Sequence, residues 1–314
     1  MVPRAELFRV FVCGVLAIGC GRVGYDPRSD AVDASLVTFD AAPIDARVEP
    51  SDAALDAPSV VEDDAGGPLA RVTFATPVRI DALSSETPDV DPCLTPDELA
   101  IYFASDRAGS RDLYVSRRES LDAPWSAPAP IAELNTTAAN ETDPWISPDE
   151  RTLYFTTNAS GTNAIWVARR ASADVPFEAP TMVALDVANA CCATLSSDEL
   201  TMMFSAVGPL DLYVVTRASV DAPWSASVAM TSLNTIDDES NPSLSELVVF
   251  DRGAADVRDL WIADLATSET RVVGGTDVNT ASDERDPWLA DGPGRLYFAS
   301  SRLGQHDLYV AERN

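Results

Sequence analysis

Acidic residues stand in spaced pairs in front of proline at regular places along this chain. At four places an Asp or Glu is followed two residues later by Asp or Asn, and a proline comes next. The pairs are Asp89 and Asp91, Glu141 and Asp143, Glu239 and Asn241, and Glu284 and Asp286. Carboxylate pairs serve as acid and base in glycoside hydrolases, and clustered carboxylates attract cations and basic peptides. These eight residues are the first candidates for chemistry.

Carboxylates alone do not identify an enzyme in so acidic a chain. Its 314 residues include 50 acidic and 22 basic side chains, a net charge of −28. No single Glu departs from the repeated pattern, as a dedicated catalyst should. We therefore expect no catalytic residue and no cofactor, with a carbohydrate-active protein, lectin-like or hydrolytic, as the alternative. The charge also disfavours binding to nucleic acid.

One histidine and a few cysteines are the other reactive residues. A lone His306 cannot build a histidine-rich metal site, and no nucleophile motif lies near it, so we expect a solvated turn residue and no metal site. Cys93, Cys191 and Cys192 are able to form disulfides if the protein is exported, because such compartments are oxidising. A vicinal bridge and three free thiols stay open as alternatives, and we expect no stable long-range bridge.

The N-terminus has the pattern of a secretory leader. Arg4 and Arg9 precede an apolar stretch over 10–18 that is too short to span a bilayer as a helix. The segment Ala17-Ile18-Gly19-Cys20 resembles a bacterial lipobox, and an ordinary leader with a chance cysteine is the alternative. The resemblance implies a signal peptide over 1–19 and a diacylated Cys20 as membrane anchor. Gly21 rather than Asp after the cysteine favours the outer membrane over the inner one.

The next segment, 20–69, is predicted to be a disordered acidic tether. Residues 21–69 contain 11 acidic side chains and 3 Arg, are rich in Ala, Pro and Ser, and have no apolar period. Such a segment buries too little apolar surface to offset the entropy of ordering, and its charges repel one another. We expect it to hold a folded domain away from the membrane.

The remainder, 70–314, consists of five copies of one unit. A segment similar to Asp-Leu-Tyr-Val recurs with its aromatic residue at 114, 166, 213, 261 and 309, at spacings of 52, 47, 48 and 48 residues. Each unit contains four short strand candidates: the Asp-Pro segment, an apolar run after a Pro-Asp-Glu turn, the Asp-Leu-Tyr-Val segment and a Pro-rich stretch. Four strands at this period predict a blade of a β-propeller.

The chain ends predict how the propeller closes. The fifth unit stops after its third strand, and an unassigned segment stands before the first unit. Aligned without gaps to the Pro-rich stretch of the first unit, Phe74 corresponds to Trp125 and Ile80 to Ile131. We therefore predict an all-β, five-bladed propeller that the N-terminal segment closes by supplying the outer strand of the last blade.

The unit Asp-Pro-Trp-x-Ser-Pro-Asp-Glu, followed by Leu-Tyr-Phe-x-Ser and Asp-Leu-Tyr-Val, resembles the WD40-like repeat of TolB-type propellers. With the lipobox and spacer, the chain is similar to secreted lipoproteins of myxobacteria. The resemblance implies that the Asp-Pro strands surround a central channel, where the eight residues named above would form an acidic ring at one mouth. The alternative is that each Asp only caps the turn that enters its blade.

Together these features predict an exported, lipid-anchored propeller that serves as a non-catalytic binding or scaffolding module in the cell envelope. Its partner would be an envelope or extracellular protein, or a glycan. We expect a monomer that contacts the membrane only through its acyl chains.

Overall fold

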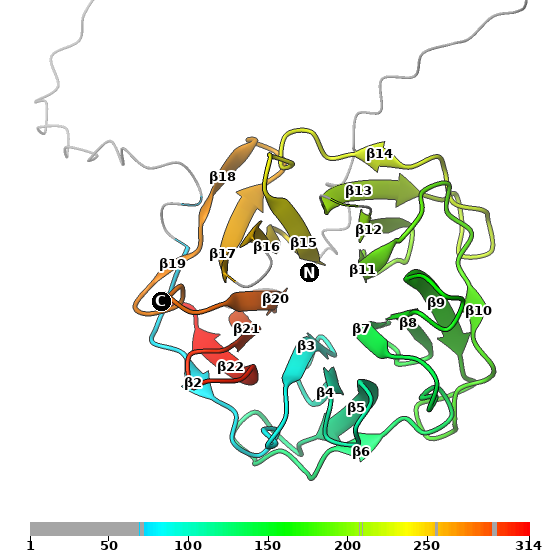
Figure 1. Cartoon of the computed structure of the whole chain (residues 1–314), viewed down its shortest axis with the longest axis horizontal. Helices are drawn as coiled ribbons and strands as arrows, with labels where there is room; N and C mark the ends of the chain where they lie inside the picture. Colours follow the sequence, from blue (N-terminus) through cyan, green and yellow to red (C-terminus); the bar gives the residue numbers. More distant parts are fainter. Residues whose placement is uncertain (1–68, 70–71, 207, 209, 255–256, 291–293) are drawn as a thin grey trace, which may run out of the picture. The chain divides into compact units, whose positions relative to one another are not determined.

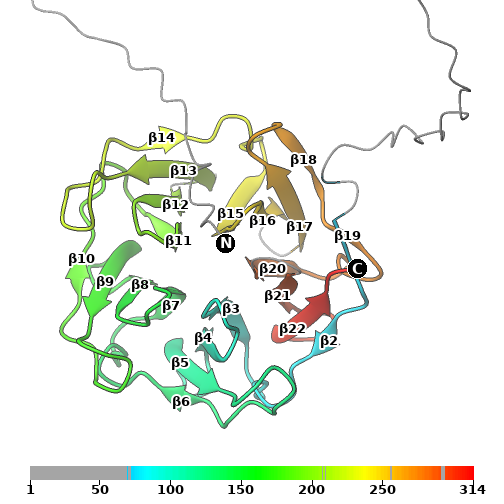
Figure 2. The same ribbon diagram turned by 180° about the vertical axis from the view of Figure 1, so that it is seen from behind.

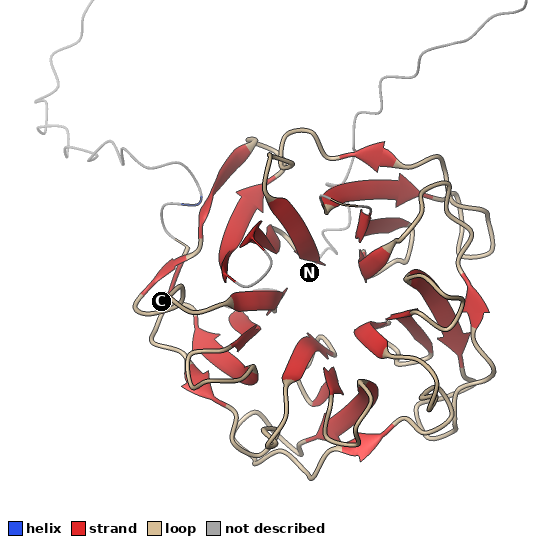
Figure 3. Cartoon of the chain, viewed as in Figure 1, coloured by secondary structure: helices blue, strands red, loops and turns tan. Residues whose placement is uncertain are grey.

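The strands of this protein form blades around a central axis (Figure 1). The computed structural model describes residues 69, 72–206, 208, 210–254, 257–290 and 294–314. Their strands make five four-stranded sheets and one two-stranded pair, and Figure 3 shows the ring built from strands and loops. The predicted all-β, five-bladed propeller is confirmed. Within the described residues, no helix has the length and apolarity needed to cross a membrane.

The blades follow one another in chain order. Blade 1 consists of β3 (Asp89–Leu94), β4 (Ala100–Ser105), β5 (Asp112–Arg117) and β6 (Ala129–Pro130). Blade 2 consists of β7 (Glu141–Ile146), β8 (Thr152–Thr157), β9 (Ala164–Arg169) and β10 (Thr181–Met182). Blade 3 consists of β11 (Cys191–Leu195), β12 (Thr201–Ala206), β13 (Asp211–Thr216) and β14 (Val228–Ala229). Blade 4 consists of β15 (Asp238–Leu244), β16 (Val248–Ala254), β17 (Val257–Asp264) and β18 (Glu269–Val272). Blade 5 consists of β20 (Glu284–Leu289), β21 (Arg295–Ser300), β22 (Asp307–Glu312) and β2 (Val78–Arg79).

The first strand of each blade lies next to the axis, as the repeat implied. Strands β3, β7, β11, β15 and β20 contact one another in cyclic order, and the same arrangement is visible from behind in Figure 2. These strands carry the Asp-Pro segments or their counterparts. The topology therefore brings the repeated acidic residues of distant chain segments to the channel region.

Apolar runs in the second strand of each blade form the core. Every residue of β4 and β8 is buried, because adjacent blades cover both faces of these strands. One aromatic residue recurs at the same place and is at most 1% exposed in every blade: Phe103, Phe155, Phe204, Phe250 and Phe298. Three of them stack on the tyrosine of the neighbouring third strand, as Phe103 does on Tyr114 with ring centroids 5.9 Å apart.

The N-terminal segment closes the ring as predicted. Strand β2 pairs antiparallel with β22, so it is the outer strand of blade 5. The Ile80 N–H donates to the Leu308 carbonyl at 2.8 Å, and its counterpart Ile131 donates to Leu113 at 2.9 Å. The closure reaches further than predicted, because β1 (Thr73–Phe74) also pairs in parallel with β19 (Gly274–Gly275), which follows blade 4.

The predicted leader, the lipidation site Cys20 and almost all of the predicted tether lie outside the described residues. The one exception is Leu69, the last residue assigned to the tether. Its side chain is fully buried with Val72 and Phe74 in a cluster that also includes residues of blades 4 and 5. The packed part of the chain therefore includes Leu69.

Candidate functional site

Five residues at equivalent positions surround the axis, and we call them the axial ring. Their backbones all have positive φ, between 50° and 60°, at a register shift in each inner strand: Asp91, Asp143, Cys192, Asn241 and Asp286. Asp and Asn tolerate this left-handed conformation better than other side chains except Gly. The bulge therefore explains why four of the five positions are Asp or Asn.

Side chains of the preceding blade hold the backbone of the axial ring. Asp286 Oδ2 accepts from the Asp91 N–H at 3.4 Å, and Asp91 Oδ2 accepts from the Asp143 N–H at 3.2 Å. Thr156 Oγ1 accepts from the Cys192 N–H at 3.0 Å, and Asp251 Oδ2 accepts from the Asp286 N–H at 3.0 Å. Asp91 and Asp286 therefore link neighbouring blades instead of capping the turns that enter them, whereas Asp143 Oδ2 accepts from Thr142 Oγ1 of its own strand at 2.8 Å.

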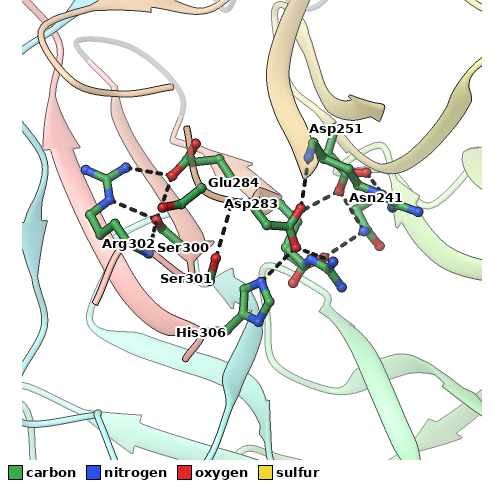
Figure 4. Close-up of polar contacts among 12 residues, drawn as sticks. Asn241, Asp251, Asp283, Glu284, Ser300, Ser301, Arg302 and His306 are labelled. Carbon is green, nitrogen blue, oxygen red and sulfur yellow. Dashed lines mark hydrogen bonds and ion pairs between the residues drawn. The ribbon is translucent and has the colours of Figure 1, made fainter. Parts of the chain in front are cut away.

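The other four predicted ring residues form a separate set, which we call the turn acids: Asp89, Glu141, Glu239 and Glu284. All four are 0% exposed. Each accepts hydrogen bonds from the loop before its own strand, as Glu284 does from the N–H and Oγ1 of Thr280, both at 2.8 Å. Figure 4 shows Glu284 with Ser300 and Arg302, which also bond to it. The repeat predicted a single ring of eight residues, whereas the turn acids are buried and hydrogen-bond to the loops that precede their strands.

A cavity of about 280 Å³ lies at one mouth of the channel, and we call it the mouth basin. The axial ring lines it, together with Asn140, Asn158 and Asn163 of blade 2 and three arginines, Arg111, Arg258 and Arg285. A smaller cavity of about 40 Å³ on the far side of the same ring is lined by prolines and by Trp145 and Trp288. The turn acids do not line either cavity.

The three arginines of the mouth basin are engaged by carboxylates outside the axial ring. Arg111 Nε and Nη2 donate to Asp106 at 2.8 and 2.9 Å, and Arg258 Nη1 donates to Asp251 at 2.8 Å. Arg285 forms a salt bridge with Asp283. No salt bridge between described residues involves Asp91, Asp143 or Asp286, so three acidic side chains lie together at the floor of the basin without a direct ion-pair partner among these residues.

Burial and the neighbouring acidic side chains change the acidity of two residues of the axial ring. Burial, followed by repulsion from Asp286 and Asp143, raises the pKa of Asp91 well above its ordinary value. Burial likewise raises the pKa of Asp286 to about 6, although nearby Arg285 acts in the opposite direction. Asp91 and Asp286 therefore hold their protons more tightly than ordinary carboxyl groups do.

Blade 4 adds a buried polar network that the other blades lack. Asp251 is 0% exposed and occupies the position that is held in the other blades by Ala104, Thr156, Ser205 and Ala299. It accepts from Ser240 Oγ, Arg258 Nη1 and Asn241 Nδ2, and Asn241 Nδ2 also reaches Asp286 Oδ1 at 2.7 Å (Figure 4). Sequence reasoning missed this network, although an Asp within an apolar run was its signal.

His306 departs from the expectation of a solvated turn residue. Its side chain is 20% exposed, and Nε2 lies 2.8 Å from Asp283 Oδ2 (Figure 4). Burial raises the pKa of Asp283, but the hydrogen bond from His306 and the charge of Arg285 outweigh it and lower the pKa overall. Ser301 Oγ accepts from the Asp283 N–H and has no described bond to His306, so these residues do not form a nucleophilic triad.

The three described cysteines are free thiols in this structure. Burial raises the pKa of Cys93 to about 12. The hydrogen bond to Cys191, burial and nearby carboxylates raise the pKa of Cys192 well above its ordinary value. Since the thiolate is the reactive form, Cys93 and Cys192 should react slowly as nucleophiles at neutral pH. The described residues also include no group of three or more His, Cys, Asp or Glu side chains placed to hold a metal ion.

The turn that joins the first two strands of a blade, Pro-Asp-Glu in blades 1 and 2 and Ser-Asp-Glu in blade 3, also carries a contact of its glutamate. The Glu of this turn has positive φ at 98, 150 and 199, and it reaches a neighbouring blade or strand end. Glu150 accepts from the Tyr102 hydroxyl of blade 1 at 2.6 Å, and Glu98 accepts from Tyr297 of blade 5 at 2.7 Å. The sequence identified these residues only as turns, because their partners lie a whole blade away.

Comparison with known proteins agrees with the fold. No protein-family model and no curated protein matches the sequence. The protein assigned as TolB in Agrobacterium tumefaciens is 15% identical over 77% of this chain and 88% of that chain, with a TM-score of 0.48. TolB from Acinetobacter baumannii is 16% identical over 74% of this chain and 56% of that chain, with a TM-score of 0.46. An endo-arabinase from Bacteroides thetaiotaomicron is 12% identical over 76% of this chain and 97% of that chain, with a TM-score of 0.53.

The chain is similar to TolB propellers. This likeness concerns the fold alone, since the same fold is shared with an endo-arabinase. Propellers host many activities, so function has to be argued from the site.

Proposed function

We propose that this protein is an exported, lipid-anchored propeller that binds a positively charged group of an envelope or extracellular protein in the mouth basin and catalyses no reaction. The mouth basin is the observation that carries the proposal. It is an open polar cavity of about 280 Å³ on the axis, and no arginine forms a described salt bridge with the three carboxylates at its floor.

Charge and size together define the group that fits. The three acidic side chains form no described salt bridge, and a partner cation would favour their ionised form and gain most where the site is partly desolvated. A cavity of about 280 Å³ has room for a side chain or a chain terminus but not for a folded domain. A Lys ammonium or an N-terminal amine meets both conditions, because each is a compact charge with several donors.

The anchor is supported by the sequence at the N-terminus. Arg4 and Arg9, the apolar stretch and the lipobox ending at Cys20 make up a lipoprotein leader, and the acidic segment after it suits a spacer. We place the protein in the cell envelope, at the outer membrane in preference to the inner one. Metabolic labelling with palmitate tests this: the wild type should be labelled and Cys20→Ala should not, and a labelled variant refutes the anchor.

Binding is tested by affinity capture from the native envelope. The full exported protein should retain a specific partner, and the double variant Asp91→Asn with Asp143→Asn should lose it. Asp122→Asn with Asp221→Asn is the matched control, because it removes the same charge from exposed loops at the opposite end of the strands. Equal capture by both double variants would show that the mouth basin is not the binding site.

A carbohydrate-active propeller is the second candidate. The raised pKa values of Asp91 and Asp286 favour it, since glycoside hydrolases pair a protonated with an ionised carboxylate. A glycan array and a reducing-sugar assay on the wild-type protein separate the two proposals. Binding or cleavage of a glycan that Asp91→Asn abolishes would favour this second function.

A further inference from the structure

Blade 3 departs from the repeat at the position that faces the channel. Every other inner strand has Asp or Asn followed by proline there, whereas blade 3 has Cys191-Cys192-Ala193. Without the proline and the Asp or Asn, this strand lacks two features that define the position in the other blades. Two adjacent cysteines stand in their place, next to the mouth basin.

The bulge brings the two thiols together. Consecutive side chains of a regular strand point to opposite faces, which would keep neighbouring sulfur atoms apart. Cys192 has φ of 60°, a conformation uncommon for residues other than Gly, Asn and Asp, and the alternation is broken there. As a result the two Sγ atoms are 2.8 Å apart. Cys191 is buried, 6% exposed, and Cys192 lines the mouth basin, so a reagent in the basin can reach the pair.

Cys93 is engaged elsewhere. It lies in the inner strand of blade 1, which is not adjacent to blade 3, and its sulfur faces the backbone of Ile146 in blade 2. The nearest thiol described for Cys192 is therefore that of its own neighbour in the chain.

We propose that Cys191 and Cys192 form a vicinal disulfide in the exported protein, which makes one wall of the mouth basin sensitive to redox conditions. The two thiols react with an external disulfide, such as that of an exported thiol oxidoreductase: one S–S bond forms between Cys191 and Cys192, the external S–S bond breaks, and the two protons pass to the released thiols. Adjacent Cα atoms are ~3.8 Å apart, shorter than the usual ~4.4–6.8 Å span of a disulfide, so the bridge should be readily reduced.

Peptide mapping of the exported protein tests this directly. Cleavage after arginine places both cysteines of the pair on the fragment 171–217 and Cys93 on the fragment 80–107. The protein is denatured and alkylated without reductant, then mapped by mass spectrometry. We expect fragment 171–217 to carry no alkyl group and to be lighter by two hydrogen atoms than the dithiol form, and to gain two alkyl groups after reduction.

The other outcomes decide against the proposal. Two alkyl groups on fragment 171–217 without reductant would show free thiols, and a cross-link to fragment 80–107 would show a long-range bridge. Cys192→Ser is the control: its fragment should take up one alkyl group with or without reductant. Titration with mixtures of oxidised and reduced glutathione should convert the wild-type fragment reversibly. This inference does not depend on the ligand proposed for the basin.

Discussion

The titration of Asp286 gives the most direct test of the reasoning about the axial ring. Its pKa is about 6 in the folded protein against an ordinary value of 3.8, chiefly because the carboxyl is buried. At ~1.4 kcal/mol for each pKa unit, ionising this group in the folded state costs about 3 kcal/mol relative to the unfolded chain. The variant Asp286→Asn removes the titration and keeps an oxygen that can accept a hydrogen bond.

The sign follows from proton binding. Between pH ~4 and ~6 the folded protein retains the proton on Asp286 while the unfolded chain has lost it. Stability contributed by this residue is therefore greatest at low pH, falls as the pH rises through this window, and is constant above it. Carboxylates with lowered pKa values, such as Glu150 and Asp283, act in the opposite direction at lower pH, so the difference between wild type and variant is needed to isolate Asp286 together with its repulsion of Asp91.

Urea unfolding followed by tryptophan fluorescence measures that difference. The free energy of unfolding of the wild type minus that of Asp286→Asn should fall by about 2 kcal/mol from pH 4 to pH 7. Asp122→Asn, an exposed loop variant, should run parallel to the wild type over the same range. A difference that stays flat, or that rises with pH, would refute the account of a desolvated carboxyl at the axis.

Three further variants test the closure and the contacts between blades. Phe74→Ala removes a fully buried ring and should lower the free energy of unfolding by about 3–5 kcal/mol, which is roughly 6–20 °C in the melting temperature measured by calorimetry. Val78 is 64% exposed in the same segment, so the control Val78→Ala should change stability by less than about 0.5 kcal/mol. Gly275→Ala should lower the melting temperature by more than an ordinary exposed Gly→Ala change, because its Cβ would lie 2.4 Å from the Phe74 carbonyl oxygen at a φ of 149°; an unchanged melting curve would contradict this. Glu150→Gln should lower the free energy of unfolding by about 1–3 kcal/mol at pH 7, and this loss should vanish in acid. Burial raises the pKa of Glu150, but the hydrogen bonds from Arg117 and Tyr102 outweigh it and lower the pKa overall. Equal losses of stability at pH 7 and pH 3 would contradict this.

The closure was predictable because the blades repeat. Phe74, Ile80 and Leu83 match Trp125, Ile131 and Leu134 of the first unit, and corresponding backbone hydrogen bonds form at Ile80 and Ile131. Residue type and spacing are enough in such a case, because each unit needs the same outer strand. The parallel pairing of β1 with β19 left no such signal, since it depends on a close approach at Gly275.

The division of the predicted acidic ring was not predictable from spacing. Residues two apart in a strand share a face, so Asp89 and Asp91 were expected to act together. The bulge after Val90 gives Asp91 a left-handed conformation, which turns Asp91 toward the channel while Asp89 stays buried against Arg107. A bulge depends on the neighbouring strand as well as on local sequence, so alternation alone could not reveal it.

The differences among blades give the mouth basin a direction. A strictly repeated ring would present the same group five times and could orient no ligand. Here Asp286, Asp91 and Asp143 lie on the consecutive blades 5, 1 and 2, and the neutral Cys192 and Asn241 lie on blades 3 and 4. Asp91 is central in the acidic half, and repulsion from both of its acidic neighbours contributes to its raised pKa. A cation should therefore bind off the axis beside Asp91, with the cysteine pair and the amide of Asn241 facing the uncharged part of the same ligand.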